Sequence, residues 1–313
     1  MDTLTNVLDT LHFGSAFYFS TVYSPPWSIA IPTYKNVARF HYVTQGTCWV
    51  RIEGVEQPML LRDGEMIIVP HGCAHIMSYE ADAEPMMLDD VLAAAQYDGG
   101  GKLLLGEPDP VASTRLVCGH FEFSQVYSHP LIQNLPTYIV INENNSSEYS
   151  WLKDSLRFME HVATEGQLGS EAILKRLSEI VFIQSVKHWS ATHQIDTGFV
   201  AALNDKQLSK SLTAFHSHYC GDWSIDRMAE LAGMSKSLFS DKFKRFLNVS
   251  PMQYVAHWRM QNAQRLLLES NHNLEQIANL VGYETVASFS KAFKRILGVS
   301  PGEYRRSDSE STS

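Results

Sequence analysis

Histidine and cysteine residues recur two positions apart in the first half of the chain, and both types can bind a metal. Cys73 and His75 form one pair, Cys118 and His120 form another, and His41 lies in a separate strand-like run. Residues i and i+2 of a β-strand face the same side, so each pair would present its two side chains together. Thiolate and imidazole groups suit zinc or iron. These five residues are our candidate effector pocket or metal site.

The same residues also have a structural interpretation, which we favour. Such pairs arise easily on strands, and a buried cysteine behaves as a small hydrophobic residue. A redox-sensing thiol is a third interpretation, and it would require an exposed cysteine with a lowered pKa. The sequence therefore predicts no required cofactor and no firm metal site, and it leaves open a bound metal or an unidentified small-molecule effector. His129 and Pro130 are interpreted as loop structure.

A second set of residues could contact DNA. Short hydroxyl groups fit against base edges, lysines reach phosphates, and helix N-termini attract phosphate. Two segments in the last third of the chain carry such side chains on one predicted helix face. They are Ser235, Lys236, Ser237, Ser240, Asp241 and Lys244 in the first, and Thr285, Val286, Ala287, Ser288, Ser290, Lys291 and Lys294 in the second. The alternative for one segment alone is an ordinary solvated helix face.

The two segments belong to an internal repeat. FKRFLNVSP begins at Phe243 and FKRILGVSP begins at Phe293, and the likeness extends over residues 224–254 and 273–304. Each copy has a short apolar helical stripe, a glycine (Gly233 or Gly282), and a second stripe built on phenylalanines. The second copy has one extra residue after its glycine, which places a turn there. Two short helices joined by a glycine turn are typical of a helix-turn-helix, so the sequence predicts two.

The repeated phrase also marks where helices end and begin. Asn248 and Gly298 suit the left-handed position that closes a helix. Ser250–Pro251 and Ser300–Pro301 supply an N-cap followed by proline at the first helical position. The helix predicted from Pro251 to about Glu269 would connect the two copies. Two reading helices about 34 Å apart would fit two successive major-groove segments of DNA.

Length, composition and charge set the frame. A chain of 313 residues with 44% hydrophobic and 19% charged residues predicts two globular domains. We expect a cytoplasmic protein without membrane association, because there is no membrane-length apolar run and no basic leader, and the four cysteines are scattered. Residues 1–200 hold 11 Lys and Arg against 23 Asp and Glu, whereas residues 201–313 hold 14 against 11. This asymmetry indicates that only the C-terminal part faces a polyanion.

The segment from about Asp205 to Arg306 resembles the DNA-binding domain of the AraC/XylS family of bacterial transcription regulators. The doubled helix-turn-helix, the connecting helix and the closing GYETVASFSKAFKRILGVSPGEYR carry the resemblance. It implies base contacts by Ser237, Ser240 and Asp241 in the first reading helix, and by Val286, Ala287, Ser288, Ser290 and Lys291 in the second. It also implies double-stranded DNA as partner, a homodimer, contact with RNA polymerase and, often, transcriptional activation.

The N-terminal part resembles the cupin-type effector domain of some regulators of this family. GEMIIVPHGCAH (64–75) fits the second cupin signature, and RFHYVTQGTCWVRIEG resembles the first, although only His41 stands where that signature has its metal ligands. Short strands with glycine turns over residues 15–125 predict an antiparallel β barrel or sandwich. The expected fold is therefore multidomain α and β: a cupin-like barrel, a helical linker and an all-α double helix-turn-helix.

The predicted boundaries are 1–145 for the sensor domain, 146–200 for linker helices, 201–307 for the DNA-binding domain and 308–313 for a disordered tail. The helix over 171–189 could cap the barrel or form an antiparallel seam in a dimer. The chain is predicted to be a sequence-specific, effector-responsive transcription regulator and not an enzyme. The alternative is a metal-dependent cupin enzyme with a DNA-binding tail, and it is disfavoured because the first signature supplies one ligand. A purely architectural DNA binder would leave the acidic domain unexplained.

Overall fold

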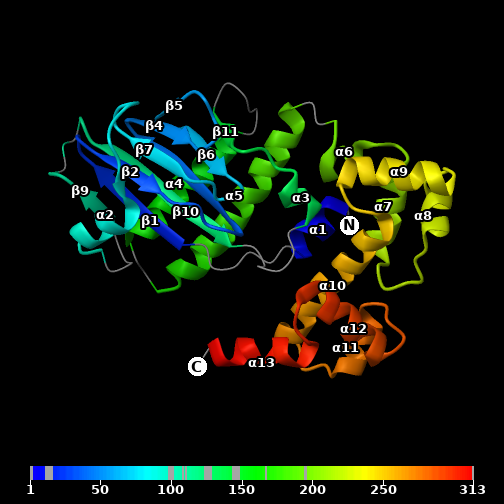
Figure 1. Ribbon diagram of the computed structural model, residues 1–313. Helices are drawn as coiled ribbons and strands as arrows, with labels where there is room; N and C mark the ends of the chain where they lie inside the picture. Colours follow the sequence, from blue (N-terminus) through cyan, green and yellow to red (C-terminus); the bar gives the residue numbers. More distant parts are fainter. Residues whose placement is uncertain are drawn as a thin grey trace. The chain divides into compact units, whose positions relative to one another are not determined.

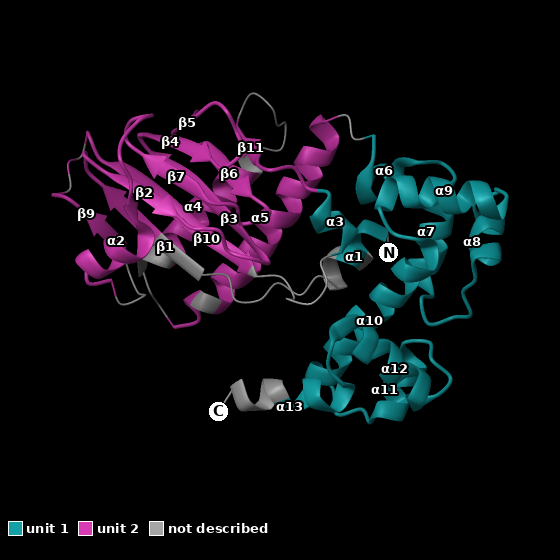
Figure 2. Cartoon of the chain, in the orientation of Figure 1, with its two compact units in different colours: residues 1–12, 126–134, 195–313 teal, residues 13–125, 135–194 magenta. Residues whose placement is uncertain are grey.

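The computed structural model describes residues 3–10, 17–97, 102–107, 109, 111–122, 129–142, 149–165, 168–193 and 196–311. The chain forms two compact units that do not follow its order (Figure 2). Residues 13–125 and 135–194 make a β-rich unit, and residues 1–12, 126–134 and 195–313 make a helical unit. The predicted boundaries follow the chain instead, so they assign the short segments 1–12 and 126–134 differently.

The β-rich unit contains two sheets (Figure 1). The six-stranded sheet has the order β11-β6-β3-β10-β1-β9, and the five-stranded sheet has the order β5-β4-β7-β2-β8. The strands of the first are β1 (Phe17–Tyr23), β3 (Val37–Gln45), β6 (Met66–Val69), β9 (Lys102–Leu105), β10 (Thr114–Glu122) and β11 (Ile139–Ile141). Those of the second are β2 (Ser28–Ile31), β4 (Thr47–Ile52), β5 (Met59–Arg62), β7 (His75–Ser78) and β8 (Met86–Met87).

Most strand pairs are antiparallel, as the sequence predicts, but the edge strands β9 and β8 pair in parallel with β1 and β2. A parallel pair cannot be joined by a hairpin, and several strands separate these partners along the chain. The short helix α2 (Leu88–Ala94) lies between β8 and β9. The expectation of an antiparallel barrel is therefore corrected at one edge strand of each sheet.

The core of this unit lies between the sheets. Alternate residues of β4 (Cys48, Val50 and Ile52) join the buried apolar cluster, while Trp49 and Arg51 face the other side. Two long helices, α4 (Tyr149–Glu165) and α5 (Ser170–Thr192), pack against one another and against strands of the six-stranded sheet. The rings of Phe121 on β10 and Phe182 on α5 lie 5.1 Å apart. The predicted linker helices thus cover the sandwich.

The helical unit carries the internal repeat. Its helices are α1 (Thr3–Thr10), α3 (Pro130–Gln133), α6 (Gly198–Asn204), α7 (Leu208–Ser217), α8 (Ile225–Leu231), α9 (Lys236–Leu247), α10 (Pro251–Glu269), α11 (Leu274–Leu280), α12 (Val286–Leu297) and α13 (Pro301–Ser311). His129 caps α3 and Pro130 is its first residue, which corrects their interpretation as loop structure. α13 extends into the predicted disordered tail. None of the described helices combines the length and the apolar character needed to span a bilayer.

Candidate functional site

The first helix-turn-helix consists of α8 and α9, and its boundaries follow from local chemistry. Ser224 caps α8 by accepting the N–H of Arg227, and Ser235 caps α9 by accepting the N–H of Leu238. α9 ends at Asn248, whose φ of 58° lies in the left-handed region that asparagine tolerates. The predicted stop signal is confirmed.

The second helix-turn-helix, α11 and α12, repeats these devices. Asn273 caps α11 in a capping box with Gln276, and Thr285 caps α12 by accepting the N–H of Ser288. Gly298 ends α12 with φ of 80°. Between α11 and α12, position 282 requires glycine for two reasons. Its φ is +80°, and a Cβ there would lie 2.5 Å from the carbonyl oxygen of Cys220.

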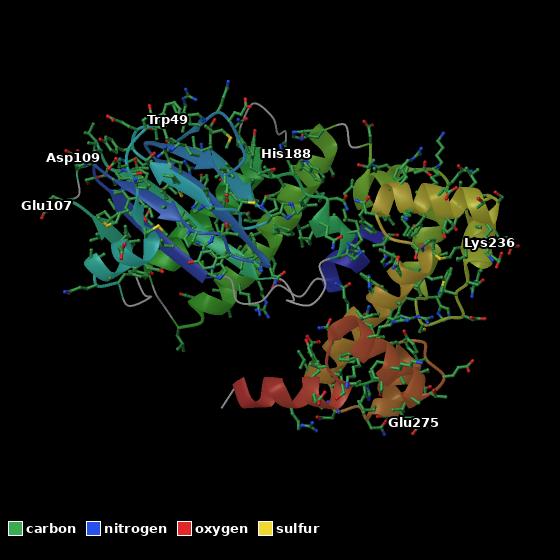
Figure 3. The ribbon with its side chains drawn as sticks, in the orientation of Figure 1. Trp49, Glu107, Asp109, His188, Lys236 and Glu275 are labelled. Atoms are coloured by element: carbon green, nitrogen blue, oxygen red, sulfur yellow. The ribbon has the colours of Figure 1, made fainter. Side chains whose placement is uncertain are left out.

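The two faces predicted to contact DNA are open to solvent. Of the thirteen residues, ten are exposed, and Ser240, Val286 and Ser290 are half-buried. Their buried counterparts, Phe239 and Phe243 on α9 and Phe289 and Phe293 on α12, form the cores beneath. Figure 3 shows Lys236 projecting outward from the start of α9. The structure thus leaves these side chains available to a ligand, and their contacts with bases stay a prediction.

Four of the predicted contact residues already have side-chain partners, and Ser288 is one of them, because its hydroxyl donates to the carbonyl of Thr285 at 2.9 Å. The hydroxyls of Ser235 and Thr285 cap their helices, so each is committed to a backbone N–H. The Lys236 ammonium lies 2.8 Å from an oxygen of Asp226, with both side chains more than half exposed. An exposed pair of this kind contributes little and can open for a phosphate. Ser235, Thr285 and Lys236 are therefore better suited to placing the helix ends than to reading bases.

Arg259, on the connecting helix α10, ties the two helix-turn-helix pairs together. Its guanidinium donates to the carbonyls of Tyr219 (3.0 Å) and Gly221 (2.6 Å), which precede α8, and to the carbonyl of Gly282 (3.0 Å). One rigid five-donor group therefore links α10 to the segment that leads into the first pair and to the turn of the second pair. Sequence analysis missed Arg259 because the carbonyls it binds lie far from it in the chain.

Three further residues on the reading helices were also missed. Arg245 and Arg295 occupy matching positions in the last turns of α9 and α12 and are exposed. Leu238 on α9 is 57% exposed. Arg245 and Arg295 suit phosphates, and Leu238 offers an apolar contact of the kind that suits a thymine methyl group. The sequence signal was present in the repeated KR dipeptide.

The sandwich brings together three of the five candidate effector residues. Cys118 Sγ lies 3.1 Å from His41 Nδ1, His41 Nε2 lies 2.8 Å from His75 Nε2, and His75 Nδ1 lies 2.8 Å from the carbonyl of Cys73. His41, His75 and Cys118 are each at most 3% exposed. Cys73 contributes its backbone rather than its thiol. His120 is half-buried two register positions further along β10 than Cys118, opposite Arg39.

The hydrogen bonds specify one arrangement of protons. A carbonyl only accepts, so His75 Nδ1–H donates to Cys73 and His75 Nε2 must accept from His41 Nε2–H. His41 Nδ1 is then left to accept from the Cys118 S–H. Burial lowers the pKa of His75 to about 4, and burial, followed by His75 and Arg39, lowers that of His41 well below its ordinary value. Burial also raises the pKa of the Cys118 thiol. All three groups are therefore neutral.

This neutral chain fits the structural interpretation. The two nitrogens of His41 point to different partners, so no single ion could meet His41, His75 and Cys118 through the contacts observed. Within the described residues, no three His, Cys, Asp or Glu side chains are grouped to hold a metal. A buried thiol with a raised pKa also lacks the thiolate that redox sensing requires. The adjoining cavity measures about 20 Å³, room for about one water molecule.

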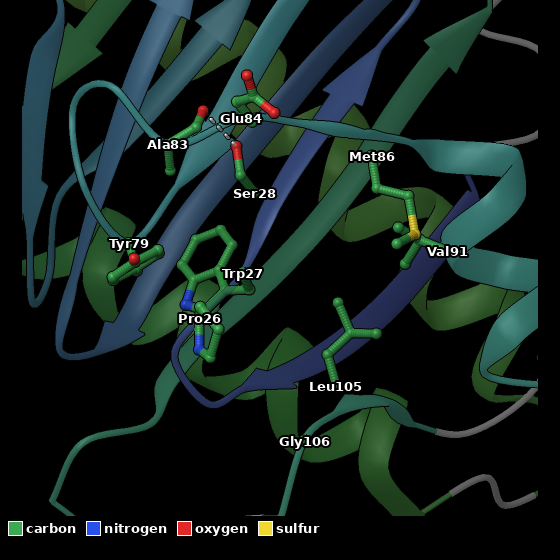
Figure 4. Close-up of a pocket in the computed structure, with 10 residues that line it drawn as sticks. All are labelled: Pro26, Trp27, Ser28, Tyr79, Ala83, Glu84, Met86, Val91, Leu105 and Gly106. Carbon is green, nitrogen blue, oxygen red and sulfur yellow. Dashed lines mark hydrogen bonds between the residues drawn. The ribbon is translucent and has the colours of Figure 1, made fainter.

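Two larger pockets open on the same unit. One, of about 430 Å³, is shown in Figure 4 and lies between β2, β8, α2 and β9. Its lining includes Trp27, Tyr79, Met86 and Leu105, and one charged residue, Glu84. The second pocket measures about 420 Å³, and its lining includes Arg51 and Met87. It also includes His75, one of the five candidate effector residues. Trp27 is 4% exposed, and its indole N–H has no partner in the described part of the chain.

Comparison with known proteins decides the family. A cupin family model matches residues 2–191, more than half of the chain, and a helix-turn-helix domain model matches residues 228–307. The transcriptional regulator AlkR of Acinetobacter baylyi is 28% identical over 98% of this chain and 99% of its own length. A Streptomyces lividans protein named as an AraC-like transcription regulator is 27% identical over 98% of both chains.

This chain belongs to the AraC-like transcription regulators. Its N-terminal part is a cupin domain, and its C-terminal part carries the family's helix-turn-helix. Among solved structures, the DNA-binding domain of AdpA in complex with a target DNA is 26% identical and covers 33% of this chain and 93% of that domain, with a TM-score of 0.32. The predicted family, fold class and DNA-binding regulatory function are confirmed, and the relatives named here are regulators.

Proposed function

We propose that this AraC-like regulator reads two successive major-groove segments with α9 and α12 and responds to a small molecule bound by its cupin domain. The observation that carries the proposal is the pair of equally capped helices, each with an exposed hydroxyl- and lysine-bearing face, tied by Arg259. The test is selection of bound fragments from random DNA by the purified protein. Recovery of two conserved blocks one helical turn apart is expected, and a single block would contradict the two-helix account.

The effector site we favour is the pocket of Figure 4. Its size is in the range of ligand pockets, and its lining is mainly apolar and aromatic. Trp27 and Tyr79 give the pocket two aromatic side chains, and Met86, Val91 and Leu105 give it apolar ones. We therefore expect a compact, mainly apolar molecule.

Two neighbouring methionines provide a matched test of that site. Met86 lines the Figure 4 pocket and Met87 lines the pocket beside His75, and they are 51% and 47% exposed. We expect Met86→Trp to abolish, and Met87→Trp to preserve, the thermal shift produced by compounds found in a binding screen. The opposite pattern would move the effector site to the pocket beside His75.

The proposal also covers the oligomeric state, the effect on transcription and the location of the protein. We expect a homodimer that activates transcription through RNA polymerase in the cytoplasm. The support for the dimer is an uncovered stripe on α5: Ile173 and Ile180 are 43% and 38% exposed, and Leu177 and Gln184 between and after them are half-buried. Their spacing of three and four residues matches a helix–helix seam. The opposite face of α5 covers the sandwich, so one helix can serve both roles.

A further inference from the structure

A loop of the sandwich contributes a helix to the DNA-reading unit. α3 lies in the chain between β10 and β11, yet residues 126–134 belong to the same compact unit as residues 195–313 (Figure 2). α3 packs against α6. A Cβ on Gly198, at the start of α6, would lie 2.9 Å from the side chain of Asn134, and the φ of Gly198 is +92°. The two segments therefore approach so closely that the position requires glycine.

His129, the cap of α3, is joined to the reading unit by a hydrogen-bonded chain. Its Nδ1 accepts the N–H of Leu131 at 3.0 Å, so the ring proton must lie on Nε2. Nε2–H then donates to the Tyr254 hydroxyl of α10 at 2.9 Å, and that hydroxyl donates to His216 Nε2 of α7 at 2.7 Å. One assignment of protons satisfies all three bonds.

This chain is sealed from water. His129 and Tyr254 are each 1% exposed and His216 is 5% exposed. The rings of Phe199 and Trp258 pack edge-on against His129 at 4.7 and 5.4 Å. Removing one member of a buried polar chain leaves its partner without a hydrogen bond, so the arrangement depends on every member.

Two sets of contacts connect α3 to the first reading helix, α9. The Tyr254 ring contacts Phe243 on the buried face of α9, with ring centroids 5.6 Å apart. The C-cap residue of α6, the helix against which α3 packs, is Asp205, and its carboxylate lies 2.7 Å from the Lys242 ammonium of α9. The second reading helix, α12, packs instead in an apolar cluster drawn from α10, α11 and α12, with Tyr283 and Tyr304 against it.

We propose that His129 is a positioning residue for DNA reading: it holds α9, and not α12, in the orientation needed to discriminate bases. The proposal rests on the assignment of α9 and α12 as reading helices. In this proposal, the segment of His129 and α3, which lies between two strands of the effector domain in the chain, helps to read DNA. A change in the β10–β11 loop would thereby reach one half of the operator.

The experiment uses the full-length protein and the DNA site that it selects. Binding is measured on that site and on two versions, each with bases altered in one segment. One of the two altered sites should bind the Lys291→Ala variant as well as the unaltered site does. The segment altered in that site is assigned to α12. An alteration in the other segment should cost the wild-type protein about tenfold or more in affinity. We expect it to cost His129→Asn less than about threefold, while discrimination at the α12 segment stays at the wild-type value.

The variants separate the roles of His129. Asparagine keeps an acceptor for the Leu131 N–H and loses the bond to Tyr254. Tyr254→Phe keeps the ring and removes only the hydroxyl, so it should change discrimination in the same direction. Gln133→Ala, an exposed position on α3, is the matched control and should behave as wild type. Circular dichroism at the assay temperature checks folding, and Tyr254→Phe carries the test if His129→Asn is unfolded.

Two results would overturn the proposal. One is wild-type discrimination at both segments in His129→Asn and Tyr254→Phe. The other is an equal loss at both segments, which would indicate general destabilisation. A wild-type protein that discriminates at only one segment would instead overturn the two-helix account itself.

Discussion

Lys291 is the residue on which the second reading helix can be tested most simply. It is exposed on α12, in the second turn after the Thr285 cap, and its removal leaves the buried face of that helix intact. We expect Lys291→Ala to weaken binding to the selected site by about 1–3 kcal/mol. A gel-shift titration measures the change, and Lys187→Ala, an exposed lysine on α5, is the control. Unchanged affinity in Lys291→Ala would remove this residue from the interface.

The buried histidines His41 and His75 make stability depend on pH. Both have folded-state pKa values below that of the unfolded chain, about 6.5. Below pH 6.5 the unfolded chain takes up protons that the folded sandwich does not, so stability falls as pH falls. For His75 the loss runs from about pH 6.5 to about pH 4, at about 1.4 kcal/mol per pH unit.

Urea unfolding between pH 7.5 and 5 measures this loss. The double variant His41→Leu/His75→Leu removes both titrating groups and fills their space with apolar atoms. We expect a shallower dependence on pH in the variant than in the wild type. An unchanged slope would show that these imidazoles are not held neutral. His129 and His216, also buried with lowered pKa values, contribute to the slope in both proteins.

At the scale of elements, Arg259 governs how the two helix-turn-helix pairs cooperate. Lysine could not reach the carbonyls of Tyr219, Gly221 and Gly282 with one planar group. We expect Arg259→Lys to leave each pair folded but to lower affinity for DNA carrying both segments by about tenfold, because the reading heads lose their fixed spacing. The variant should bind single-segment DNA as the wild type does. An equal loss on both DNAs would contradict this role.

The success of sequence analysis also varies by element. The caps at Ser235, Asn248 and Ser250 were predictable because each depends on neighbours within four residues. The alternation of β strands predicted that Cys73 would pair with His75 and Cys118 with His120, but the structure instead brings together His41, His75 and Cys118, which come from both sheets. The partners of Arg259 and His129 lie 23 to 125 residues away, and no local pattern encodes such contacts. The parallel pairing of the edge strands β8 and β9 was not predicted for the same reason.

At the scale of the whole molecule, the proposed dimer rests on the exposed stripe of α5. We expect Ile180→Glu to convert the dimer to a monomer, because a charge would have to be buried in the helix–helix seam. Light scattering coupled to gel filtration measures the mass. Glu179→Gln, a neighbouring change outside the exposed apolar stripe, is the control. A dimer of unchanged stability in Ile180→Glu would exclude this seam.

The central claim is that α9 and α12 engage one face of DNA together. Hydroxyl-radical footprinting of the full-length protein on its selected site tests it most directly. The account predicts two protected patches on the same face of the duplex, about one helical turn or 34 Å apart, with the second lost in Lys291→Ala. A single protected patch, or two patches on opposite faces, would contradict it.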